Sequence, residues 1–249
     1  MNRIQHLVEP HRLFLAWQRP VAGMEHRSRR IVGEIERRAD GAIFRYLENL
    51  PDYQEARREG FQGFPAFSIG KGQEYTSSGV LKAFMRRLPP RKREDFSEYL
   101  AQFRLPIPFD GSDMALLAYT GAKLPGDGFE IIPDLADALP PIELVMELAG
   151  FRHQAVSASS LSVGESVTLV AEPDNPADPD AIAVRHRAGR IGYIAKPYCA
   201  TVANWLRAYT VEASIERING KPERPLVYLF VKITSKAREQ SEVPYLPTR

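Results

Sequence analysis

Four carboxylates are concentrated in the short segment from Glu172 to Asp180, which also contains three prolines. Carboxylate oxygens at alternate positions are typical of calcium-binding loops. The spacing here departs from that pattern, because Pro176 takes the third position, the required glycine is absent, and Arg185 takes the twelfth position, where a bidentate glutamate belongs. The sequence therefore disfavours a calcium loop.

A second chemistry for the same segment is a metal-dependent nuclease, in which Glu172, Asp178 and His186 hold a cation that activates water. Strand alternation places His186 on the apolar face of the segment that follows the turn, at its end. We expect a rim position for this histidine rather than a metal ligand. The nuclease stays as an alternative.

Other catalytic signatures are missing from the sequence. The glycine-containing segments 60–65 and 69–72 lack the spacing of a phosphate-binding loop, and neither a Gly-x-Ser-x-Gly elbow nor an HExxH motif occurs. We therefore predict a protein that is not an enzyme and that needs no cofactor and no metal.

The single cysteine, Cys199, excludes an intrachain disulfide and a thiolate metal site, and it fits a reducing compartment. Residues 1–20 alternate charged and apolar side chains, so we expect no signal peptide, and no segment approaches the roughly 18 apolar residues of a membrane span. We expect a cytoplasmic protein.

Charge is balanced along the chain, which has 249 residues, 33 Lys and Arg, 31 Asp and Glu, and a net charge of +2. Neither half is strongly basic, so any contact with nucleic acid should be a compact local site with a shallow salt dependence. We interpret the basic runs at 27–30, 86–87 and 91–93 as solvated faces.

Hydrophobic periodicity predicts an α+β protein with a mixed α/β first half. There we expect strands within 12–47 and at 129–133, and helices at 52–59, 79–88, 91–103 and 112–119. The second half is predicted to consist mostly of strands, which favours a small closed or half-closed barrel. Its expected strands are 145–151, 166–170, 181–185, 191–194, 211–218 and 226–233, with one helix at 197–206.

An acidic segment flanked by prolines, residues 133–141, separates these two patterns. We place the domain boundary there. The predicted domains are residues 1–139, an interaction domain, residues 140–237, the barrel with its helical insert, and residues 238–249, a C-terminal tail.

The second half resembles the HIRAN domain. The resemblance covers about residues 143–235 and depends on five segments, which are 149–152, Gly164-Glu165, 172–176, 178–184 and 189–194. It implies a small OB-like β-barrel with a helical insert. In the eukaryotic fork-remodelling helicases that carry it, the domain binds single-stranded DNA at a free 3′ end.

The resemblance also implies roles for individual residues. Asp178 is at the position of the family's conserved aspartate and would accept a hydrogen bond from a 3′-hydroxyl, whereas it would repel a terminal phosphate. Asn175 would hold the turn or the sugar. Arg152 and Lys196 match positions that contact phosphates.

Two aromatic side chains complete the predicted DNA site. His153 is at a position where an aromatic ring commonly stacks on a base, and Tyr193 lines the same edge. Ala177 departs from the family pattern, because well-studied members have a tyrosine there. The alternative for Asp178 is purely structural, as a turn residue that accepts backbone N–H bonds.

The first half more faintly resembles the N-terminal subdomain of HipA-type kinase toxins, through residues 84–90 and 115–127. Our leading hypothesis is a non-enzymatic, bacterial-type protein that binds single-stranded DNA or free 3′ ends and has an N-terminal protein-interaction domain. A HipA-like kinase or a DNA-processing enzyme is the expected protein partner. A regulator of such a kinase, without DNA binding, is a further alternative.

Overall fold

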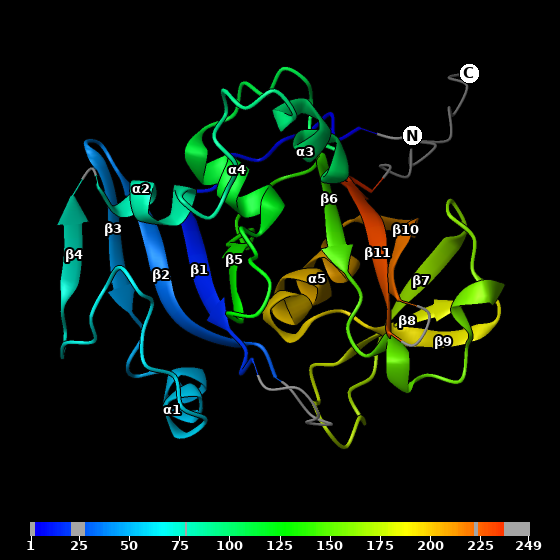
Figure 1. Cartoon of the computed structure of the whole chain (residues 1–249). Helices are drawn as coiled ribbons and strands as arrows, with labels where there is room; N and C mark the ends of the chain where they lie inside the picture. Colours follow the sequence, from blue (N-terminus) through cyan, green and yellow to red (C-terminus); the bar gives the residue numbers. More distant parts are fainter. Residues whose placement is uncertain (1–2, 21–27, 78, 222–223, 237–249) are drawn as a thin grey trace, which may run out of the picture.

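The computed structural model describes residues 3–20, 28–77, 79–221 and 224–236, which form two antiparallel sheets joined through helices and loops (Figure 1). The predicted α+β fold class is confirmed. The first sheet has the order β4-β3-β2-β1-β5. Its strands are β1 (Arg12–Trp17), β2 (Arg30–Arg38), β3 (Gly41–Tyr46), β4 (Glu74–Ser77) and β5 (Phe129–Pro133).

Aromatic side chains fill the core of the first half. Phe44 on β3 lies in contact with Phe67 and Phe84, at ring-centroid distances of 4.7 and 5.5 Å. The hydroxyl of Tyr46 accepts a hydrogen bond from the Phe64 amide and donates one to the Phe67 carbonyl, so a buried polar atom is satisfied. Aromatic packing thus holds the long 59–73 connection against the sheet.

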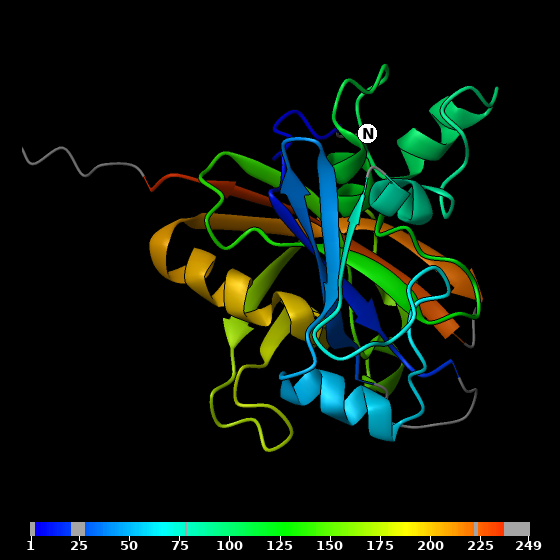
Figure 2. The same ribbon diagram turned by 90° about the vertical axis from the view of Figure 1, so that its left-hand side faces the viewer.

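Four helices cover the first half, and Figure 2 shows α1 across one end of the strands. The Ser112 hydroxyl caps α4 by accepting from the Ala115 amide, and α4 ends at Gly121, whose φ of 67° suits glycine. The helices are α1 (Pro51–Arg58), α2 (Gly79–Met85), α3 (Phe96–Gln102) and α4 (Asp113–Thr120).

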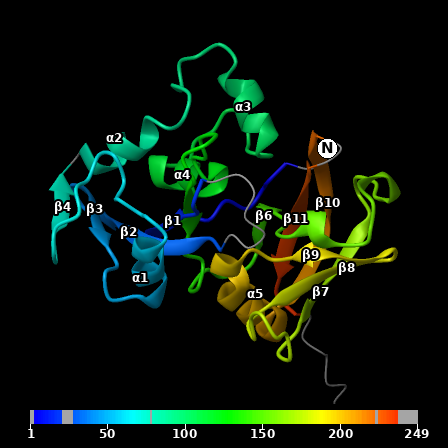
Figure 3. The ribbon, with the colours of Figure 1, turned by 60° about the horizontal axis from the view of Figure 1, so that its bottom comes forward.

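The second sheet has the order β6-β11-β10-β7-β8-β9, and α5 (Lys196–Ala208) lies between the strands of the two sheets (Figures 1 and 3). Among the described residues, the edge strands β6 and β9 do not pair with each other, so the barrel is not closed; an isolated antiparallel bridge joins Tyr193 on β9 to Ala149, two residues after β6. Its strands are β6 (Ile142–Glu147), β7 (Ser166–Ala171), β8 (Ile182–His186), β9 (Gly189–Tyr193), β10 (Thr210–Lys221) and β11 (Arg224–Thr234).

Polar contacts join the two halves. Arg104, just after α3, forms an ion pair with Glu216 on β10, and their side chains are only 8% and 7% exposed. Glu143 on β6 accepts from the Gln5 amide at 2.7 Å, and Lys123 lies 2.6 Å from Glu147. The two halves are therefore fixed to each other through buried and half-buried charges.

Several predicted elements differ from the structure. The helix expected over residues 91–103 contains only α3, because the Arg93 and Phe96 amides bond three residues back and form successive turns. His186 is buried instead of at a rim, and its Nε2 lies 3.1 Å from a Glu165 oxygen. The side chain of Arg87 is 7% exposed and pairs with Asp127, so it does not belong to a solvated face.

The proposed boundary near residue 140 stays a prediction, as does the HipA-like character of the first half. The predicted tail, residues 238–249, lies outside the described residues. Among the residues that the structure describes, no helix is both long enough and apolar enough to span a membrane.

Glu216→Gln should destabilise the protein by about 3–5 kcal/mol, because it leaves the buried Arg104 guanidinium without its counter-charge. Chemical denaturation would measure this change in the free energy of unfolding. Glu55→Gln is the matched control, since it breaks an exposed pair with Arg58 and should cost less than about 1 kcal/mol. Equal, small effects of both substitutions would contradict a structural role for the buried pair.

Candidate nucleic-acid interface

The turn that follows β7 is held by its own side chains. The Asn175 side-chain oxygen accepts from the amides of Ala177 and Asp178, at 3.0 and 3.3 Å. One carboxylate oxygen of Asp178, Oδ1, accepts from the Asp180 amide at 3.0 Å. The predicted capping role of Asp178 is thus present, but it occupies only Oδ1, and Oδ2 has no hydrogen-bond partner among the described residues.

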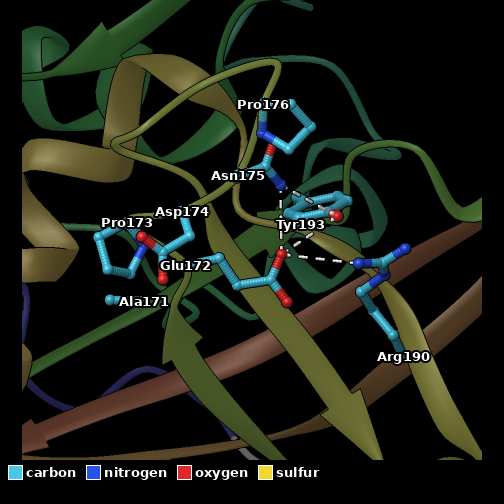
Figure 4. Close-up of a pocket in the computed structure, with 8 residues that line it drawn as sticks. All are labelled: Ala171, Glu172, Pro173, Asp174, Asn175, Pro176, Arg190 and Tyr193. Carbon is cyan, nitrogen blue, oxygen red and sulfur yellow. Dashed lines mark hydrogen bonds and ion pairs between the residues drawn. The ribbon is translucent and has the colours of Figure 1, made fainter.

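Glu172 organises the outer side of this turn (Figure 4). Its Oε2 accepts from the Asn175 amide group at 3.2 Å and from the Tyr193 hydroxyl at 3.3 Å, and it lies 3.6 Å from Arg190. Desolvation would raise the pKa of Glu172, but hydrogen bonds from Asn175, Arg185 and Tyr193 and the charge of Arg190 outweigh it. The pKa therefore lies below its usual 4.5.

Asn175 and Tyr193 line the pocket around Glu172, which has a volume of about 530 Å³ and is called the Glu172 pocket below. The Arg190 guanidinium lies 5.1 Å from the centre of the Tyr193 ring and covers it. Asn175 and Tyr193 therefore both have partners within the chain, as expected for residues that support the turn.

The other four predicted site residues line a second pocket of about 440 Å³, called the Asp178 pocket below. Asp178 and Ala177 contribute one wall of it. These four residues come from three separate segments of the sequence, which the fold brings to one cavity. They are Arg152, His153, Asp178 and Lys196.

A short 3₁₀-helix, η1 (Phe151–His153), presents Arg152 and His153 to the Asp178 pocket. Gly150 precedes it with φ of 71°, and the buried Phe151 anchors it in the core. Arg152 and His153 are exposed, and Arg152 Nε donates to His153 Nε2 at 2.9 Å. The two planar groups are therefore held side by side at the pocket.

The bridge between Ala149 and Tyr193 fixes η1 relative to the turn. The amides of Ala149 and Tyr193 each donate to the other residue's carbonyl, at 2.8 and 2.9 Å. Gly192 allows this approach, because a Cβ there would lie 2.5 Å from the Ala149 oxygen, and its φ is +149°. Only glycine fits this position without a shift of the backbone.

Lys196 is the first residue of α5, and a side chain from the first half of the protein lies close to it. Its ammonium group lies 3.9 Å from Asp52 on α1, and its side chain is 52% exposed. An exposed pair at this distance is weak and can exchange for a ligand phosphate. Lys196 therefore remains available to an anion in the Asp178 pocket.

Sequence analysis missed the residues that the Asp178 pocket takes from other elements. Gln18, Ser28 and Arg29 come from the first half, and Arg224 comes from the start of β11. Arg29 lies 2.7 Å from Glu130. No local motif marks these residues, because only the packing of the two halves brings them to the pocket.

The residues of the nuclease alternative are engaged elsewhere. Glu172 lies among Asn175, Tyr193 and two arginines, and His186 lies against Glu165. In the described part of the chain, no cluster of three or more His, Cys, Asp or Glu residues is suited to holding a metal ion. Burial raises the pKa of the Cys199 thiol to about 11, so this group is not a reactive thiolate.

Comparison with known proteins matches the second half to a family. Residues 142–236 fit the model of the HIRAN domain, from the first residue of β6 to just beyond β11. The crystal structure of the HIRAN domain of human HLTF is 21% identical, with 36% of this chain and 74% of that chain covered and a TM-score of 0.29. A crystal structure of a Lactobacillus plantarum protein is 19% identical, with 38% and 95% covered and a TM-score of 0.31. No curated protein matches the chain.

Gly192→Ala should destabilise the protein by about 2–4 kcal/mol, because the added methyl group collides with the Ala149 carbonyl and breaks the bridge. Gly164→Ala is the matched control: Gly164 also has positive φ, but a Cβ there meets nothing within 4 Å. It should cost only about 1–2 kcal/mol of backbone strain. Thermal and chemical unfolding would compare the two variants, and equal losses would show that the close approach does not matter.

Proposed function

Because residues 142–236 form a HIRAN domain, we propose that this protein binds single-stranded DNA and recognises a free 3′-hydroxyl end in the Asp178 pocket. The observation that carries the proposal is the placement of Asp178. Its carboxylate lines a pocket with Arg152 and Lys196, and one of its oxygens has no hydrogen-bond partner among the described residues.

The chemistry of the pocket distinguishes a hydroxyl end from a phosphorylated end. A 3′-hydroxyl donates a hydrogen bond, which Asp178 Oδ2 can accept, whereas a 3′-phosphate places negative charge against the carboxylate. The Oδ1 atom is held by the Asp180 amide, so the carboxylate does not rotate freely. A preorganised acceptor of this kind supports selectivity for the hydroxyl end.

The two cations of the pocket suit the phosphate that precedes the terminal nucleotide. Arg152 and Lys196 enter the Asp178 pocket from η1 and from the start of α5. Arginine and lysine next to an acceptor for a hydroxyl match a sugar with a phosphate on its 5′ side. The His153 ring and the Arg152 guanidinium offer planar surfaces to the terminal base.

We propose binding without catalysis, in the cytoplasm. The thiol of Cys199 is buried, Glu172 is ion-paired with arginines, and His186 lies against Glu165, so these described side chains offer no activated nucleophile and no metal cluster. The protein then acts by holding a DNA end, and any processing of that end belongs to a partner.

Asp178→Asn tests the hydroxyl claim, because it keeps an oxygen for the Asp180 amide and removes the negative charge. Wild-type protein should bind a strand with a 3′-hydroxyl at least about tenfold more tightly than the same strand with a 3′-phosphate. The substitution should abolish most of that preference, as measured by fluorescence anisotropy. Asp174→Asn, in the same turn but in the Glu172 pocket, should retain it. Equal binding of both ends by the wild type would refute the proposal.

Ala177→Tyr tests the stacking surface of the same pocket. Ala177 is exposed on the wall of the Asp178 pocket, so a tyrosine there can extend over a bound base without burial of new polar atoms. A stacked ring contributes about 1–3 kcal/mol per base, so the affinity for a short 3′-hydroxyl strand should rise at least about fivefold. An unchanged or lower affinity, with an unchanged unfolding temperature, would place the terminal base elsewhere.

A further inference from the structure

The Asp178 pocket continues into a second hollow at the junction of the two halves. This hollow, called the Arg19 pocket below, has a volume of about 290 Å³. It shares Gln18, Arg29 and Arg224 with the Asp178 pocket. A bound DNA strand that leaves the Asp178 pocket over these residues therefore enters the Arg19 pocket.

Positive charge gathers along these two pockets, although the whole chain carries only +2. Both halves contribute to a set of six cations, against three carboxylates. The cations are Arg19, Arg29, Lys123, Arg152, Lys196 and Arg224. The fold thus assembles a basic track from residues that are dispersed in the sequence.

Not all of these cations are available to a ligand. Lys123 lies 3.1 Å from Glu130 and 2.6 Å from Glu147, and Arg29 lies 2.7 Å from Glu130, so these two are neutralised. Arg19 and Arg224 differ from them, because both are exposed and neither makes a side-chain hydrogen bond or ion pair with another described residue. These two guanidinium groups are therefore open to phosphate.

The backbone fixes both arginines beside the junction. The Gln18 amide donates to the Gly128 carbonyl at 2.9 Å, and a Cβ on Gly128 would lie 1.9 Å from the Gln18 oxygen. This close contact holds the end of β1 against the start of β5 and fixes the direction of the backbone at Arg19. Arg224 begins β11, which is paired with β6 next to the Asp178 pocket.

We propose that the first half completes the DNA site, and that the strand leading to the 3′ end runs from the Asp178 pocket into the Arg19 pocket, where its phosphates contact Arg224 and Arg19. This inference rests on the proposed function and extends it. The ligand is single-stranded DNA several nucleotides long, and the binding surface is formed by both halves of the chain. Because the track adds phosphate contacts, the affinity should fall more steeply with salt concentration than the affinity of a site that binds the 3′ end alone.

The experiment compares a trinucleotide with a strand of about ten nucleotides, both with a 3′-hydroxyl, using the full chain. The longer strand should bind at least about tenfold more tightly, and its plot of log affinity against log salt should be steeper by about 0.7 for each added phosphate contact. Arg19→Gln should lower affinity for the longer strand about fivefold, reduce the slope by about 0.7, and leave trinucleotide binding unchanged. Arg224→Gln should also lower the affinity for the longer strand.

Arg187→Gln is the matched control, because this arginine is exposed, lies at the turn between β8 and β9, and lines neither pocket. It removes the same charge and should leave both affinities unchanged. If the longer strand binds no better than the trinucleotide, or if Arg19→Gln and Arg187→Gln behave alike, the track is wrong. End recognition would still stand if the trinucleotide distinguishes a 3′-hydroxyl from a 3′-phosphate, whereas absence of binding by either strand would overturn both proposals.

Discussion

The bridge between Ala149 and Tyr193 is the constraint on which the candidate site depends. Two backbone hydrogen bonds join the otherwise open edges of the second sheet, and Gly192 permits them because it has no Cβ. The bridge brings η1, with Arg152 and His153, next to the turn that carries Asp178. Without it, the two walls of the Asp178 pocket would belong to independent loops, and the order needed to recognise a small end group would have to be gained on binding.

The second requirement is a fixed relation between the halves. Arg104 and Glu216 are buried together, and Lys123 and Arg29 link the carboxylates that line the junction. Lys123 and Arg29 neutralise Glu130 and Glu147 in the basic track, whereas Arg19 and Arg224 stay open. In the proposed mechanism, the HIRAN domain reads the end of the strand and the first half holds the strand that leads to it.

Sequence patterns predicted most of the fold, because strands such as β1 and β7 and helix α5 have clear periodicity. They missed β4, which is an edge strand held by its pairing with β3, and η1, which depends on the positive φ of Gly150. The Asp178 pocket was partly predictable, since four of its residues were named through the HIRAN resemblance. The contributions of Arg19, Arg29 and Arg224 could not be predicted from the sequence. They arise from packing across the chain, and the balanced net charge of the whole sequence does not indicate a local basic track.

The most direct test is to map, by NMR, which backbone amides respond to a short strand that ends in a 3′-hydroxyl. The account predicts that the largest shifts occur at residues 150–153 and 177–180 and at the start of α5, and that a 3′-phosphate on the same strand greatly reduces them. Shifts that are confined to other surfaces, or that are the same for both ends, would contradict recognition of a 3′-hydroxyl in the Asp178 pocket.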